Sequence, residues 1–142
     1  MNYICDNDKI LVSISKGEFV NQSILDVAKI NGVDFGWING LGAIIDPELG
    51  YYDIQNKKYI RKVIEGEFEL TSLVGNITYN ENAPFIHSHI TFSDINFKAY
   101  GGHLFDCRIA AAGEFIILKG SERINREYNN DIGLSLWNCK ND

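Results

Sequence analysis

Three histidines are the residues of this 142-residue chain whose type and spacing could do chemistry. They are His87, His89 and His103, and no other histidine occurs in the sequence. His87 and His89 lie two positions apart on an expected strand, so both rings point to the same face. Imidazole binds zinc, copper, nickel or iron, and an open zinc site typically has three protein ligands. The pattern predicts a three-histidine metal site, and the alternative is a set of polar surface histidines.

Strand alternation decides whether the three rings can meet. The residues expected on the face opposite His87 and His89 are apolar: Ile86, Ile90 and Phe92. His103 is expected on the same face of its strand as three residues that are expected to face the core: Phe105, Cys107 and Ile109. The rings then meet if a β-bulge at Gly101-Gly102 re-aims His103. Alternatively, the histidines converge across a subunit boundary, and both readings stay open.

Two further side chains could take part in catalysis. Cys107 could pair with His103 as a nucleophile. However, four residues of strand span about 13 Å at roughly 3.4 Å per residue, which favours a buried structural thiol. Glu114 lies between two apolar runs, either at a hairpin end or facing a pocket. There it could act as a general base if burial raised its pKa.

The segment Gly40-Leu41-Gly42-Ala43 superficially resembles a dinucleotide-binding loop. It lacks the third glycine of the GxGxxG pattern, and no crossover helix is expected after it. The glycines are better explained by close packing between strands.

The elements that must position these residues are mainly strands. Hydrophobic alternation predicts strands at residues 9–15, 35–45, 49–53, 58–64, 67–77, 85–92, 100–112, 114–118 and 133–137. A helix is expected at about residues 20–30, with turns at 46–48 and 55–57. The expected fold class is α+β, a curved and mainly antiparallel sheet with one or two helices. One helix covers such a sheet incompletely, which favours an oligomer.

Composition predicts a single globular domain over residues 1–142. Apolar residues make up 45% of the chain, enough for a core, and the length suits one domain. The chain contains 13 Lys and Arg residues and 19 Asp and Glu residues, which give a formal net charge of −6. This acidity disfavours general nucleic-acid binding, which needs cations to contact phosphates.

Cysteine usage and hydropathy predict a cytoplasmic protein without a membrane partner. The three cysteines, Cys5, Cys107 and Cys139, are far apart and form no CxxC motif, so reduced thiols are expected. The N-terminus has no apolar segment typical of a signal peptide. No apolar run approaches the roughly 18 residues of a membrane-spanning helix.

An ordered set of segments resembles the free-standing prokaryotic form of the PPC domain, conserved between plants and prokaryotes and also called the DUF296 or PD1-like DNA-binding domain. The matching segments are GEF at 17–19, GLGA at 40–43, YYD at 51–53, GEFELTSLVGN at 66–76, PFIHSH at 84–89, GGHL at 101–104, Glu114 and GL at 133–134. The likeness spans nearly the whole chain. It implies a curved antiparallel sheet and assembly as a homotrimer.

The resemblance also implies a metal site, with zinc at His87, His89 and His103. Plant members join the domain to an AT-hook that binds AT-rich DNA. This chain contains no Arg-Gly pair, so it lacks that DNA-binding element.

Three functions follow from these observations. The first is a homotrimeric binding or regulatory module with a three-histidine zinc site and a small-molecule or protein ligand. The second is a metal-dependent enzyme on a small molecule, with Glu114 as base or as a partner of the metal ligands. The third is a DNA-associated regulator, which the acidity and the missing AT-hook disfavour.

Overall fold

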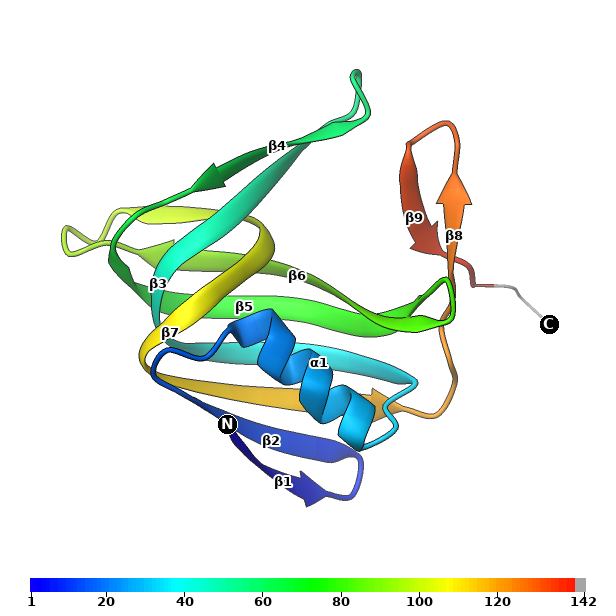
Figure 1. The fold of residues 1–142 in the computed structure, drawn as a ribbon, viewed down its shortest axis with the longest axis horizontal. Coiled ribbons are helices and arrows are strands. Elements are labelled where there is room, and N and C mark those ends of the chain that lie inside the picture. The colour runs from blue at the N-terminus through cyan, green and yellow to red at the C-terminus, as the bar shows by residue number, and fades with distance from the viewer. Residues whose placement is uncertain (140–142) are drawn as a thin grey trace.

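The computed structural model describes residues 1–139, in which one helix accompanies nine strands (Figure 1). Their bounds are β1 (Asn2–Asp6), β2 (Lys9–Ser15), α1 (Val20–Ile30), β3 (Phe35–Asp53), β4 (Lys58–Val63), β5 (Glu67–Asn80), β6 (Ala83–Ser93), β7 (Ala99–Gly120), β8 (Arg126–Asn129) and β9 (Leu134–Trp137). The expected α+β class, with a mainly antiparallel sheet, is confirmed. No helix among these residues is long and apolar enough to cross a membrane.

Seven strands form one antiparallel sheet in the order β1-β2-β7-β6-β5-β3-β4. Strand β7 also pairs with β3, so β7, β6, β5 and β3 close into a ring. Strands β3 and β7 are long enough, at 19 and 22 residues, to bend and contribute to two parts of the sheet. Figure 1 shows β7 curling from the β6 side to lie alongside β2. The remaining two strands, β8 and β9, form a separate hairpin.

Helix α1 packs across the ring because one of its faces is apolar. The buried residues repeat every three or four positions: Val20, Ser23, Ile24, Val27 and Ala28. They lie against β2, β6 and β7. The helix ends at Asn31, and Gly32 follows with φ of 59°, a left-handed conformation that suits glycine. The helix predicted at 20–30 is therefore confirmed.

Close approach inside the ring depends on glycine. A Cβ atom at Gly40 would lie 2.0 Å from the ring of Phe115, which is itself buried. Gly40 therefore allows β3 and β7 to pack directly, as the sequence led us to expect.

Two local expectations were wrong: the turn at 46–48, and the division of residues 100–118 into two strands at Gly113, which β7 crosses without a break. The segment 46–48 is not a turn between two strands, because β3 runs continuously through Pro47. Asp46 adopts φ of 49° and the register against β7 shifts between Ile45 and Glu48, so the strand bends without ending. Strands β1 and β8 were not anticipated. Every residue of β1 is exposed, so no alternation of burial marks it.

Candidate metal centre

The structure brings the three histidines together within one chain. His89 and His103 are direct cross-strand partners on β6 and β7, and His87 lies two residues from His89 on the same face. One ring nitrogen from each histidine lies within 4.8 Å of the others. The Nε2 atoms of His87 and His89 are 3.2 Å apart. No subunit boundary is needed for this convergence.

The expectation that His103 faces the core is wrong, because the register between β3 and β7 shifts just after His103. Glu48 pairs with Asp106 but Leu49 pairs with Leu104, so Phe105 is an extra residue on β7. Leu104 and Cys107 both face the core as a result, and His103 lies on the opposite face. The β6–β7 register is unbroken from residue 99 to 103, so Gly101-Gly102 is not the site of the irregularity.

Burial keeps two of the rings neutral. Desolvation lowers the pKa of His87 to about 4, with a smaller contribution from the charge of Arg126. Desolvation also lowers the pKa of His103 to about 4, assisted by His87 and His89. At neutral pH both rings are therefore in the unprotonated form that binds metals.

One nitrogen of the cluster needs a partner. The Nδ1 atom of His103 is buried, and it has no hydrogen-bond partner among residues 1–139. Burying a polar atom without a partner is costly. Together with three histidine nitrogens that face one another, this orphaned atom fits a borderline-soft metal ion such as zinc.

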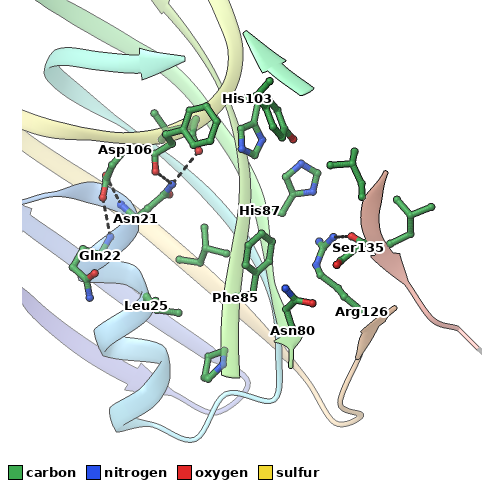
Figure 2. A pocket seen from close by; sticks show the side chains of 17 residues that line it. Asn21, Gln22, Leu25, Asn80, Phe85, His87, His103, Asp106, Arg126 and Ser135 are labelled. Carbon is green, nitrogen blue, oxygen red and sulfur yellow. Dashed lines mark hydrogen bonds between the residues drawn. The ribbon is translucent and has the colours of Figure 1, made fainter. Parts of the chain in front are cut away.

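A cavity of about 510 Å³ adjoins the histidines. It follows the free edge of β6, because residues 83–88 of that strand pair with β5 alone. Helix α1 lies on one side of this edge and the β8–β9 hairpin on the other (Figure 2). His87 and His103 line the cavity, whereas His89 is more exposed and lies outside the lining.

The start of α1 is fixed to β7 at the cavity. The backbone N–H groups of Asn21 and Gln22 donate to the two carboxylate oxygens of Asp106, at 2.9 and 3.3 Å. The Asn21 side chain donates to the carbonyls of Leu104 and Phe105, which β7 exposes where it leaves β6. Burial raises the pKa of Asp106, and these backbone donors oppose that rise. Both oxygens of the Asp106 carboxylate are therefore used to fix the start of the helix.

On the opposite wall, Arg126 is held by neutral acceptors. It donates from Nε to Thr78 Oγ1 at 2.8 Å, from Nη2 to Asn76 Oδ1 at 3.0 Å, and from Nη1 to the carbonyl of Ser135 at 2.9 Å. Its guanidinium also lies over the ring of Phe85, 4.9 Å from the centroid. Arg126 thus joins the β8–β9 hairpin to β5 beside His87.

The other two sequence candidates lie elsewhere. Glu114 is exposed, pairs in register with Ser13 and Leu41, and lines hollows separate from the histidine cavity. The expectation that it assists the metal site is therefore wrong. Cys107 is 1% exposed, and burial raises its pKa, as expected for a structural thiol.

Three cavity residues were not anticipated from the sequence: Asn21, Tyr59 and Arg126. The ring of Tyr59 lies 4.9 Å from that of His103. Each of the three comes from a segment distant in sequence from the histidines. No local pattern marks them, because contacts between segments far apart in sequence bring them to the cavity.

The fold and the site define a class: a small α+β domain with a closed antiparallel sheet and a three-histidine cluster beside a cavity. Residues 6–121 match the family model of the Plants and Prokaryotes Conserved (PCC) domain, and the chain belongs to this family. The resemblance seen in the sequence is thereby confirmed.

Solved structures support the same assignment. A candidate DNA-binding protein from Bacteroides thetaiotaomicron is 33% identical, with a TM-score of 0.93 and 96% of each chain covered. A plant- and prokaryote-conserved protein from Pyrococcus horikoshii is 28% identical, with a TM-score of 0.86, covering 99% of this chain and 96% of that one. A metal-containing protein from Archaeoglobus fulgidus is 27% identical, with a TM-score of 0.85 and 96% of each chain covered. No curated protein matches the chain.

Proposed function

We propose that this protein is a homotrimeric binding or regulatory module that holds a zinc ion at His87, His89 and His103 and takes a ligand in the adjoining cavity. The observation that carries the proposal is the meeting of three histidine nitrogens within 4.8 Å. The buried, unpartnered Nδ1 of His103 gives independent support within the described residues. The similar protein from Archaeoglobus fulgidus is described as metal-containing.

Zinc suits this donor set. Three neutral imidazoles would leave the ion its full charge and an open coordination position for a ligand. The open position matters because His87 and His103 also line the cavity. A ligand in the cavity would then lie beside the metal.

The proposed trimer would bury an apolar surface on the outside of the ring. This outer apolar face consists of exposed residues on β1, β2, β3, β5 and β7: Ile4, Leu11, Trp37, Leu41, Val74 and Leu118. Some of these residues are direct cross-strand neighbours: Ile4 pairs with Leu11, and Trp37 pairs with Leu118. Exposed apolar side chains gathered on neighbouring strands are typical of a subunit interface.

A binding role is favoured over the metal-dependent enzyme. Among residues 1–139, Asp106 is the only carboxylate that lines the histidine cavity, and it accepts hydrogen bonds from the start of α1. Glu114 lies too far away to assist. The described residues therefore offer the cavity no free carboxylate to serve as a general base.

A DNA-associated role is the second candidate, and β4 is the element that favours it. Strand β4 and the residue before it carry four cations: Lys57, Lys58, Arg61 and Lys62. However, Arg61 pairs with Glu48 at 2.7 Å, and the chain as a whole is acidic. Absence of binding to an AT-rich duplex in a low-salt gel shift would remove this candidate.

We also propose a cytoplasmic location, because the three cysteines are unpaired.

Metal analysis tests the main proposal. Protein purified without chelator is expected to contain about one zinc ion per chain by plasma mass spectrometry. His89→Ala should lose most of this zinc, and because His89 is exposed the variant should still fold. Glu114→Gln, an exposed substitution away from the cavity, is the matched control and should keep its zinc. Metal-free wild-type protein, or unchanged zinc in His89→Ala, would contradict the proposal.

A further inference from the structure

We infer that the cavity beside the histidines takes a small organic carboxylate with an aromatic or apolar body, and that Arg126 binds its carboxylate. This inference deepens the proposed function and rests on the cavity being a ligand site. Four features of the described residues carry it: the position of Arg126, its lack of an acidic partner, its spare donors and the apolar walls.

The strand register fixes the position of Arg126. Asn76 pairs directly with His87, and Thr78 pairs directly with Phe85. Arg126 donates to both Asn76 and Thr78, so its guanidinium must lie next to His87 and Phe85. The effect of its charge on the pKa of His87 agrees with this closeness. Figure 2 shows Arg126 and His87 on the same wall of the cavity.

Among the described residues 1–139, Arg126 differs from the other arginines because no carboxylate neutralises it. Arg61, Arg108 and Arg123 form ion pairs with Glu48, Asp46 and Asp34, respectively. Within residues 1–139, Arg126 lies in no ion pair, and burial lowers its pKa. A partly buried cation without an anion is unfavourable, and an anionic ligand would relieve that cost.

The guanidinium keeps donors for such a ligand. It has five N–H groups, and three donate to Thr78, Asn76 and Ser135. One N–H therefore remains on each of Nη1 and Nη2. Two donors on one planar group match the two oxygens of a carboxylate.

The remaining charges of the cavity favour an anion at this end. Asp106 is the only acidic residue that the described part of the chain contributes to the lining, and its carboxylate accepts hydrogen bonds from the backbone of Asn21 and Gln22. A zinc ion at the histidines would add a second positive charge near Arg126.

The walls between these polar groups are apolar. Tyr59, Phe85 and Phe105 contribute rings, and Leu134 and Leu136 contribute aliphatic side chains from the hairpin. The volume of about 510 Å³ lies in the range of small-molecule sites, roughly 300–1,000 Å³. These walls favour an organic anion with a ring or short chain over a strongly hydrated inorganic ion.

Calorimetry with benzoate, benzamide and inorganic phosphate tests the inference on zinc-loaded protein. We expect benzoate to bind at least about tenfold more tightly than its neutral isostere benzamide, because hydrogen bonds to a charged group are the stronger ones. Phosphate is expected to bind more weakly than benzoate. Equal affinity for benzoate and benzamide, or a preference for phosphate, would overturn the inference.

Variants then assign the anion to Arg126. Arg126→Gln should weaken benzoate binding by about tenfold or more while leaving benzamide binding nearly unchanged. Because Arg126 also holds the hairpin, Tyr52→Phe is the matched control. It removes the hydrogen bond from Tyr52 to the carbonyl of Ile132 in the hairpin but keeps the cavity cation, and it should preserve benzoate binding. Equal losses in both variants would show a structural role only, and unchanged benzoate binding in Arg126→Gln would refute the assignment.

Zinc content separates this inference from the proposed function. If the protein contains zinc but does not distinguish benzoate from benzamide, the carboxylate site is wrong and the metal site stands. If protein purified without chelator contains no zinc but still binds benzoate in an Arg126-dependent way, the carboxylate site stands and the metal proposal fails.

Discussion

The ring of His103 lies between β4 and β6, packed near Tyr59 and Phe105. Its Nδ1 is shut off from water and lacks a protein partner among the described residues. Without a metal ion such an arrangement is costly, because the ring can neither become charged easily nor satisfy all its hydrogen bonds. A bound metal ion would remove this cost, so metal binding would also stabilise the folded chain, as is usual where metal binding and folding are coupled.

The same burial predicts an acid-sensitive apo-protein. The pKa values of His87 and His103 are about 4 in the folded chain, against 6.5 for an ordinary histidine. Between these values the unfolded chain binds more protons than the folded one. The free energy of unfolding of chelator-treated protein should therefore fall as the pH drops from about 6.5 to about 4. Urea titrations at several pH values measure this slope.

His87→Gln should flatten that profile, because glutamine does not titrate. The comparison is made with chelator present in both proteins, so that loss of metal does not contribute. Parallel profiles for His87→Gln and wild type would show that His87 is not the source of the pH dependence.

At this scale the sequence predicted which histidines come together but not how. The HxH spacing places His87 and His89 on one face by strand geometry alone. The orientation of His103 depends on one extra residue in β7, Phe105, and that residue is extra only relative to β3. A bulge of this kind is a property of two strands far apart in sequence, so alternation within β7 could not reveal it.

Among the elements, α1 and β7 are joined by a carboxylate that replaces a local helix cap. The residue before α1 is Phe19, whose side chain cannot accept a hydrogen bond. Asp106 on β7 accepts from the first turn of the helix instead. The helix therefore depends on tertiary structure for the satisfaction of its first N–H groups.

Asp106→Ala should consequently lower the free energy of unfolding by about 1–2 kcal/mol, comparable to the loss of a strong helix cap. Chemical denaturation followed by circular dichroism measures the change. Asp26→Ala is the control, because Asp26 lies on the exposed side of α1 and accepts only from Gln22 of its own helix. If both variants lose the same stability, the contact with β7 has no special role.

The extent of β3 and β7 was harder to predict than α1. The helix has a regular apolar spacing and ends before Gly32, so local signals suffice. In β3 the sequence predicted a turn at 46–48, and in β7 it predicted two separate strands that meet at residue 113. Both positions are bends in continuous strands, stabilised by pairing with partners that a local pattern does not contain.

Over the whole molecule, the outer apolar face crosses five strands. Val74 on this face pairs directly with His89, so the surface reaches the candidate metal centre. In the isolated chain Ile4 is 67% exposed and Leu11 is 45% exposed. Surfaces of this composition are usually covered by another protein surface.

Light scattering at micromolar concentration is expected to give the mass of a trimer. Leu11→Asp should shift the protein to monomer, because burying an unpaired carboxylate in the interface is costly. Ile30→Asp, at the exposed C-terminal end of α1 and away from this face, should remain trimeric. A monomeric wild-type protein would contradict the assembly, and a trimeric Leu11→Asp would contradict the location of its interface.

The β8–β9 hairpin lies beyond residue 121, where the match to the family model ends. It nevertheless supplies Arg126 and one wall of the cavity. The ring of strands and the histidines can thus stay constant while this short appendage varies. Exchange of one hairpin for another is a route by which related proteins could acquire different ligand preferences on a shared scaffold, with no change to the core that makes them fold.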